Sequence, residues 1–148
     1  MLFLGTYTHN VDEKNRVAMP IKFAKNFPTK KVIISKGFDG CLEIHTIAGF
    51  TNYWNKIKEY SQNKKDTRIL TRQILANTHE IELDKANRIL IPNNLKTLAK
   101  LDKEIVFIGL GNKIEIWNAN TYKKFVNDTN SLFEQVAERI DDENNNAK

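Results

Sequence analysis

The sequence contains two copies of one unit, related by an offset of 72 residues. From residue 12 to residue 44, nine of 33 positions are identical to the position 72 residues later, and no gap is needed. Segments of that length matched by chance would share roughly two identities. The identical pairs are Asp12/Asp84, Asn15/Asn87, Arg16/Arg88, Pro20/Pro92, Lys31/Lys103, Ile33/Ile105, Gly37/Gly109, Glu43/Glu115 and Ile44/Ile116. The chain is therefore a tandem duplication, and we expect it to fold as two similar halves.

Each copy predicts a turn, a short strand, a short helix and then a hairpin. Alternation within residues 16–19 places Val17 and Met19 inward and Arg16 outward, and residues 88–91 repeat this pattern. A proline follows each strand and suits the start of a short helix, where its missing N–H costs nothing. The predicted hairpins pair Lys31–Lys36 with Cys41–His45 and Glu104–Leu110 with Lys113–Trp117.

One copy of about 45 residues buries too little apolar surface to offset its chain entropy. The two copies are therefore expected to share one core, as an internal pseudo-dimer with two-fold symmetry. This gives a mainly β fold with flanking helices (α+β), closed as one barrel. Amphipathic segments at Gly49–Gln62 and Asn120–Ile140 predict a helix after each copy. The predicted divisions are half 1 at residues 5–47, trailing and linker helices at 48–76, half 2 at 77–119, a C-terminal helix at 120–140 and an acidic disordered tail at 141–148.

Arginine is used sparingly and in fixed places. Lysine outnumbers arginine by 18 to 5, and residues 1–133 carry 21 Lys and Arg against 13 Asp and Glu. Such a basic balance favours polyanionic partners, although solvated lysines are common in soluble proteins. Arg16 and Arg88 occupy the same place in the repeated turn, and Arg68 and Arg72 lie one helical turn apart in the predicted linker helix. The use of arginine at these positions indicates a need for its planar guanidinium, whose N–H donors lie side by side, rather than for the single ammonium group of lysine.

The repeated turn has the pattern D-x-x-N-R-[VI]-x-[MI]-P, which suits a tight turn that presents arginine. Asp12 and Asp84 can bond the backbone of their own turns, and asparagine at the fourth position tolerates the left-handed conformation. One interpretation is that each arginine pairs with its aspartate to stabilise the turn, which a surface ion pair does only weakly. Retention of arginine in both copies favours contacts with phosphates and guanine edges instead.

This motif, followed by a short helix and a hairpin, resembles the SpoVT/AbrB-type DNA-binding module, and two such modules in one chain resemble the MraZ family. That family typically has D-x-K-G-R in its motif. Here the first copy has Asn15 at the usual glycine, and the second has Ala86 at the usual lysine, beside Lys85. The resemblance covers nearly the whole chain except its tail. It implies a tandem-duplicated AbrB-like β-barrel whose partner is double-stranded DNA.

The resemblance further implies a transcriptional regulator that binds repeated boxes upstream of the division and cell wall gene cluster. It implies a ring-like homo-oligomer that acts on the nucleoid. The predicted DNA-binding residues are Lys14, Asn15, Arg16, Lys85, Asn87 and Arg88, with Asp12 and Asp84 stabilising the turns and Arg68 and Arg72 as candidates for further contacts.

The sequence lacks the patterns typical of an enzyme. His9, His45 and His79 have no metal-ligand spacing, and there is no nucleophile elbow or glycine-rich phosphate loop. His45 aligns with Trp117, so we expect it to pack. The two turn aspartates could act as an acid/base pair across the halves, but turn stabilisation is far commoner. We expect no catalysis, cofactor, metal or small-molecule substrate.

An oligomeric protein-binding or antitoxin-like module without direct DNA contact is the main alternative, because aromatic residues on the trailing helices also suit subunit contacts. The single cysteine, Cys41, excludes an internal disulfide and fits a reducing cytosol. The N-terminal apolar run is too short for a signal or a membrane span. We therefore expect a cytoplasmic protein without a membrane partner.

Overall fold

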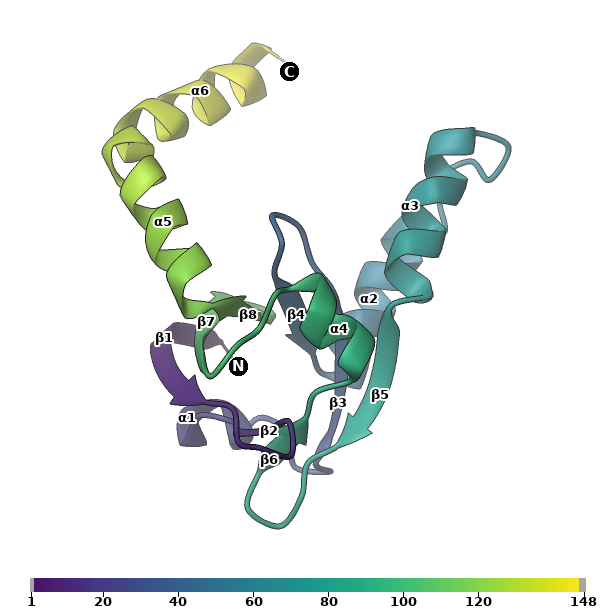
Figure 1. Ribbon diagram of the computed structural model, residues 1–148. Coiled ribbons are helices and arrows are strands. Elements are labelled where there is room, and N and C mark those ends of the chain that lie inside the picture. Colours follow the sequence, from purple (N-terminus) through teal and green to yellow (C-terminus); the bar gives the residue numbers. More distant parts are fainter. Residues whose placement is uncertain (1, 147–148) are drawn as a thin grey trace.

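A six-stranded antiparallel sheet and a two-stranded ribbon form the centre of the molecule (Figure 1). The computed structural model describes residues 2–146. The strands are β1 (Phe3–Asn10), β2 (Arg16–Ala18), β3 (Lys31–Lys36), β4 (Leu42–His45), β5 (Thr78–Glu82), β6 (Arg88–Leu90), β7 (Glu104–Gly111) and β8 (Ile114–Asn118). The sheet has the order β1-β7-β8-β4-β3-β5, and β2 pairs with β6. Within the described residues β1 and β5 are the ends of this order, so closure of the expected barrel stays a prediction.

Among residues 2–146, six α-helices flank these strands or extend from them, as expected for an α+β fold. They are α1 (Ile21–Ala24), α2 (Ile47–Ile57), α3 (Lys65–Leu75), α4 (Asn93–Leu98), α5 (Ala119–Thr129) and α6 (Phe133–Asn146), with a short 3₁₀ segment η1 (Asn130–Leu132) between the last two. Among the described residues, no helix has both the length and the apolar character needed to cross a membrane.

The two halves are interlocked by hydrogen bonding between their strands. β1 pairs with β7, β2 with β6, β3 with β5 and β4 with β8, and each of these pairs joins the first half to the second. Among the strands of residues 2–146, only the hairpins β3–β4 and β7–β8 pair within a half. Each half therefore takes most of its strand partners from the other half.

The strand order shows the internal two-fold symmetry that the repeat predicts. When each strand is replaced by its counterpart in the other copy, the result is the same strand order read from the opposite edge of the sheet. Val17 lies opposite Ile89 in the ribbon, and Glu43 lies opposite Glu115 in the sheet. Both pairs are separated by the repeat offset, so the pseudo-two-fold axis passes through them.

One hydrophobic core serves both halves, which confirms the expectation of a shared core. Its fully buried members come from both copies, and Val17 and Ile89 extend it to the inner face of the ribbon. Such a core is typical of a chain whose halves are too small to fold separately. The largest of these side chains are Phe3, Phe23, Phe107, Ile34, Leu42, Ile44, Ile89, Ile91, Leu95, Ile105, Ile114 and Ile116.

The ungapped alignment of the two copies is wrong by one residue in one strand. The core contains Val32 and Ile34 from β3 but Ile105 and Phe107 from β7, so these strands correspond at an offset of 73 rather than 72. The helix before β7 is longer than α1, and the turn after β7 is shorter than the turn after β3. The inward alternation of each strand decides the register, because a slip of one residue would turn its core face outward.

The helices differ from the predicted ranges at their ends. α2 and α5 begin after Thr46 and Asn118, whose side chains accept hydrogen bonds from backbone N–H groups of the first helical turn. η1 interrupts the predicted C-terminal helix. The expectation of a disordered tail is wrong up to Asn146, because no glycine or proline stops α6. The last two residues of the tail lie outside the described residues.

The helices after each copy form two arms that lie at the end of the molecule opposite the ribbon (Figure 1). One arm consists of α2 and α3, and the other of α5 and α6. The ribbon β2–β6 and its two turns are thus left uncovered by the longer helices. The arms and the two turns therefore lie at opposite ends of the molecule.

The interlocked strands predict that the halves cannot fold separately. A fragment of residues 1–62 retains β1 to β4 but lacks the partners of β1 and β2 and the second partners of β3 and β4. We expect its circular dichroism to show no cooperative thermal transition, and mixing it with residues 63–148 to restore one. A cooperative transition in the fragment alone would contradict the shared core.

Candidate nucleic-acid interface

Asp12 organises the backbone of the first turn, as its place in the motif predicts. Its Oδ1 accepts hydrogen bonds from the backbone N–H groups of Lys14 and Arg16, each at 2.9 Å. Its Oδ2 accepts a third from Nε of Arg16, also at 2.9 Å. Asn15 has a φ of 62°, in the left-handed region that asparagine tolerates better than most residues. The motif's aspartate and asparagine thus fix the turn from which Arg16 projects.

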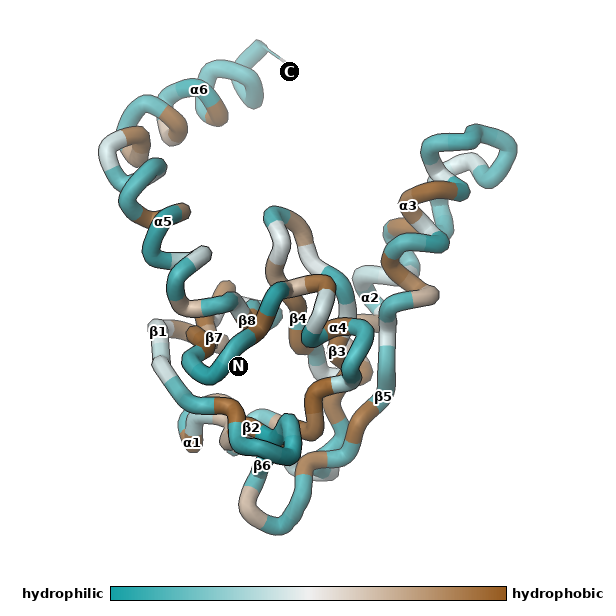
Figure 2. Tube along the Cα trace, viewed as in Figure 1, coloured by the Kyte–Doolittle hydropathy of each residue, from teal (hydrophilic) through white to brown (hydrophobic). Residues whose placement is uncertain are grey.

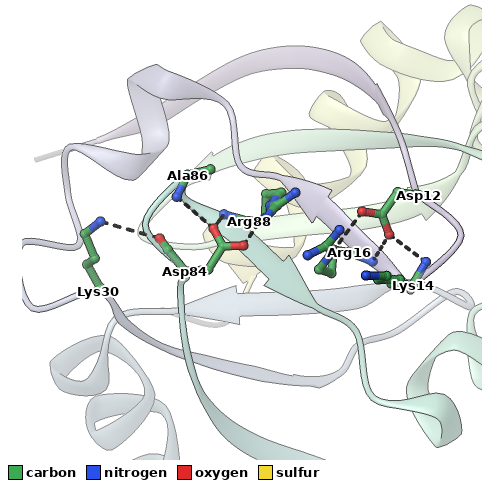
Figure 3. Close-up of polar contacts among 7 residues, drawn as sticks. All are labelled: Asp12, Lys14, Arg16, Lys30, Asp84, Ala86 and Arg88. Atoms are coloured by element: carbon green, nitrogen blue, oxygen red, sulfur yellow. Dashed lines mark hydrogen bonds and ion pairs between the residues drawn. The ribbon is translucent and has the colours of Figure 1, made fainter.

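The second turn repeats this arrangement bond for bond (Figure 3). Oδ1 of Asp84 accepts from the backbone N–H groups of Ala86 and Arg88 at 2.9 Å, and Oδ2 accepts from Nε of Arg88 at 2.7 Å. Asn87 has a φ of 58°. Replacement of the usual lysine by Ala86 leaves this geometry intact, because the backbone N–H of that residue makes the bond.

These hydrogen bonds lower the pKa of both aspartates. The backbone N–H of Arg16 is the main cause of the lowered pKa of Asp12, and the backbone N–H of Arg88 is the main cause for Asp84. The arginine side chain of each turn lowers the pKa further. A carboxyl group with a lowered pKa is a weak base, which disfavours the acid/base role considered for this pair.

Both arginines lie on the outward face of the ribbon. Val17 and Ile89 point into the core, so alternation along β2 and β6 turns their neighbours outward. On that face Arg16 lies opposite Leu90, and Arg88 lies opposite Ala18. The arginine side chains are 31% and 36% exposed. The pseudo-two-fold pairing thus brings two residues that are 72 positions apart onto one surface.

The predicted pairing of arginine with aspartate leaves much of each guanidinium free. Within residues 2–146, Arg16 and Arg88 bond their aspartates through Nε alone. The two terminal NH₂ groups of each fork therefore remain for an external acceptor. Such a fork matches phosphate oxygens and the paired acceptors of a guanine edge. Turn stabilisation and ligand binding are thus compatible uses of the same side chain.

The structure brings some predicted site residues together and separates others. Lys14 and Lys85 are exposed in the two turns, beside the arginines. Arg68 and Arg72 lie on α3, in an arm at the opposite end of the molecule (Figure 1). Nη1 of Arg68 donates to the carbonyl of Gln62 in the preceding loop, 3.0 Å away. A duplex that lies on the ribbon would not reach these two arginines.

Two residues near the first turn were missed by the sequence reasoning. Nζ of Lys96 donates to Oδ1 of Asn15 at 2.6 Å, and Nδ2 of Asn15 donates to Oδ1 of Asn93 at 3.4 Å. Self-comparison could not find them, because the corresponding residues of the first copy are Ile21 and Ala24. The only available signal was their place on the short helix α4, which follows β6.

The histidines do not form a reactive cluster. Nε2 of His45 bonds Oε1 of buried Glu43 at 3.0 Å, and the ring packs against Phe50 and Tyr53, as its alignment with tryptophan predicted. Burial alone would raise the pKa of Glu43, but hydrogen bonds from His45 and Lys113 lower it below its usual value. No group of three or more potential metal ligands occurs among the described residues.

Comparison with known proteins gives full-length matches. The model of a family described as "MraZ protein, putative antitoxin-like" matches residues 2–73 and again residues 74–144. The chain is similar to proteins named "Transcriptional regulator MraZ". One from Mesoplasma florum is 44% identical over 140 residues, which cover 95% of this chain and 96% of the relative. One from Mycoplasmoides gallisepticum is 43% identical over 142 residues, 96% of this chain and 99% of the relative.

A more distant relative extends this similarity. A protein of the same name from Thermoanaerobacter sp. is 39% identical over 143 residues, which cover 97% of this chain and 99% of the relative. The two matches of the family model meet near the end of α3. Each match contains four of the eight strands, so the family model finds the same duplication as the self-comparison.

The left-handed turn residue makes a stability prediction. Asn87 has positive φ, and glycine adopts this conformation without a steric cost, whereas alanine does not. We expect Asn87→Ala to lower the free energy of unfolding by about 1–2 kcal/mol and Asn87→Gly to change it by less than about 0.5 kcal/mol. Urea unfolding of both variants checks this, and equal losses would show that the backbone conformation is not what asparagine supplies.

Proposed function

Because this chain belongs to the MraZ family, we propose that it is a transcriptional regulator that binds double-stranded DNA through the ribbon β2–β6. The observation that carries the proposal is the pair of equivalent Asp–Arg turns on one outward face. Each turn presents an arginine fork with free terminal nitrogens and an adjacent lysine. The names of the relatives describe a regulator and not an enzyme.

The residues of the two turns take different parts in this binding. Arg16 and Arg88 donate to guanine edges or phosphates, and Lys14 and Lys85 contact phosphates as single charges. Asp12 and Asp84 hold the arginines, while Asn15 and Asn87 provide the left-handed backbone. The two turns are placed symmetrically about the pseudo-two-fold axis. This placement suits a DNA duplex, whose two strands are themselves related by two-fold symmetry.

We further propose that the chain binds repeated boxes upstream of the division and cell wall gene cluster, as an oligomer on the nucleoid in the cytoplasm. Two arginines on one small ribbon give few contacts, and a genomic regulator must compete with abundant non-specific DNA. Several linked subunits on several boxes would overcome this limit, because the second contact becomes intramolecular. An oligomer would thus supply the affinity that the small interface of one subunit lacks.

The second helical arm supports this oligomer. α5 and α6 enclose an open, mainly apolar pocket with a volume of about 580 Å³. Figure 2 shows hydrophobic residues recurring along both helices. Phe133 is 77% exposed, which is unusual for a phenylalanine without a partner. The side chains that line this pocket include Tyr122, Phe125, Leu132, Phe133, Val136 and Ile140.

The first helical arm offers a complementary partner for it. Ile69, Leu70 and Ile74 of α3 line an apolar groove of about 390 Å³ with Phe38 of the hairpin loop. α3 and the residue before it carry Lys64, Lys65, Arg68 and Arg72 against Asp66, whereas α6 carries Glu134, Glu138, Asp141, Asp142 and Glu143 against Arg139. Contact between the second arm of one copy and the first arm of the next is a head-to-tail interface, which closes into a ring when the rotation allows it.

An antitoxin-like module that binds protein without touching DNA is the second candidate, and the description of the family favours keeping it. The two candidates differ in one property of the pure protein. A DNA-binding ribbon retains duplex DNA in a manner that weakens steeply with salt, because phosphate contacts release counterions. A protein-binding module shows no such retention.

Substitution of the first turn tests the interface. We expect Arg16→Ala to weaken binding to the protein's own upstream DNA by about 1–3 kcal/mol, as loss of a bidentate base contact does. Lys14→Ala should lower the slope of log affinity against log salt by about one unit. Lys22→Ala, on the short helix α1 and outside both turns and both helical arms, is the control and should leave DNA binding unchanged. Equal affinity of the wild-type and Arg16→Ala proteins in filter binding would contradict the assignment of the ribbon.

A series of DNA boxes tests the oligomer. Affinity for two or three boxes at their natural spacing should exceed affinity for one by on the order of a hundredfold. An insertion of about 5 base pairs should abolish this gain, because half a helical turn rotates one box away from its subunit. Filter binding to the series measures both effects. Equal affinity for all of the duplexes would show that each subunit binds DNA independently.

A further inference from the structure

The opposite half supports the two turns unequally. One bond is common to both: the carbonyl of Asn15 accepts from the backbone N–H of Ile91, and that of Asn87 accepts from Met19, each at 2.9 Å. The first turn has two further bonds. The side-chain amide of Asn15 accepts from Nζ of Lys96 at 2.6 Å and donates to Asn93 at 3.4 Å. We call Asn15, Asn93 and Lys96 the cross-half clamp.

The second turn has no equivalent clamp. The positions that correspond to Asn93 and Lys96 are Ile21 and Ala24, whose side chains cannot form hydrogen bonds. Among the described residues, the side-chain bond from outside the second turn comes from Nζ of Lys30, which donates to the carbonyl of Asp84 at 3.4 Å. That bond holds the start of the turn and leaves the Asn87 side chain unsupported.

The charges of the two turns differ as well. Residues 12–16 contain Asp12 and Glu13 against Lys14 and Arg16, so the first turn has no net charge. Residues 84–88 contain Asp84 against Lys85 and Arg88, so the second turn carries a net charge of +1. The less supported turn is therefore the better one for attraction to phosphates. The first turn thus has the lower net charge of its own and the larger number of side-chain bonds to the opposite half.

We propose that the cross-half clamp makes the first turn the one that recognises bases, while the second turn mainly binds the phosphate backbone. The inference rests on the proposed DNA binding and adds a division of labour to it. Base recognition needs an arginine fork held in one geometry, whereas phosphate contacts tolerate a mobile donor. Asn93 and Lys96 are positioning residues in this proposal, because both bond the side chain of Asn15 and act on Arg16 through the turn.

The test compares two lysine variants on two kinds of DNA. Lys96→Met keeps the length of the side chain but removes the donor, and Lys22→Met, on the short helix α1, is its matched control. For each protein, Kd is measured for the protein's own upstream region and for a duplex of scrambled sequence, over a range of salt concentrations. Lys96→Met should lower the ratio of these affinities by about tenfold, within the range of one lost base contact. The control should leave the ratio unchanged.

A positioning role is distinguished from a direct contact by the salt dependence. If Lys96 positions the turn, Lys96→Met leaves the slope and the affinity for scrambled DNA unchanged, and Lys96→Arg, which keeps a donor, restores the ratio. If both duplexes weaken equally and the slope falls by about one unit, Lys96 is a phosphate contact and the inference is wrong. An unchanged ratio also overturns it. A wild-type protein without any sequence preference would contradict the proposed function itself.

Hydrogen exchange in the free wild-type protein gives a test that needs neither variant nor DNA. Because the clamp restricts the first turn, backbone amides of residues 12–16 should exchange more slowly than those of residues 84–88. Equal or faster exchange in the first turn would show that the clamp does not fix its geometry. This outcome is independent of whether the protein binds DNA.

Discussion

The rest of the structure depends on hydrogen bonding between strands of opposite halves. A half on its own would leave β1 and β2 without partners and would expose unpaired N–H and C=O groups along β3 and β4. Pairing with the second half satisfies these groups and closes one core around side chains of both copies. The duplication is thus a structural requirement, because the second copy completes the fold of the first.

The same pairing creates the surface that we assign to DNA. The pseudo-two-fold axis passes between Val17 and Ile89, so the two arginine turns flank it on the outward face of one ribbon. The axis also passes between Glu43 and Glu115 in the sheet, and the helices that follow each copy extend from that end (Figure 1). The surface that we assign to DNA and the two arms to which we assign contacts between subunits therefore lie at opposite ends of one pseudo-two-fold axis.

Some of this arrangement could be predicted from the sequence, and the reasons for the rest are physical. The repeat predicted the shared core, and the turn chemistry of Asp12 and Asn15 predicted the outward arginine, because both depend on local residue properties. The edge strands β1 and β5 were not predicted as strands, since they contain many polar residues and gain their partners only from the other half. The one-residue offset between β3 and β7 was hidden by chance identities at Lys31 and Ile33.

Other parts of the site depend on contacts that no single-chain pattern reveals. Asn93 and Lys96 bond the side chain of Asn15, about 80 residues earlier in the chain. Self-comparison of the repeat cannot show these bonds, because the other copy has no equivalent of them and the internal symmetry is broken there. Arg68 and Arg72 were considered with the turn arginines because arginine is scarce in this lysine-rich chain, and the fold places α3, which carries them, in an arm at the far end (Figure 1). Residue type identified the chemistry, whereas strand pairing decided which residues share a surface.

The central claim is that strand pairing between the halves builds one DNA-binding face from two distant turns. Hydrogen exchange of the full-length protein with and without its own upstream DNA tests this most directly. The account predicts that DNA slows exchange in residues 12–18 and 84–90 together and leaves α3 unchanged. Protection of α3 around Arg68 and Arg72 without protection of the turns would contradict it.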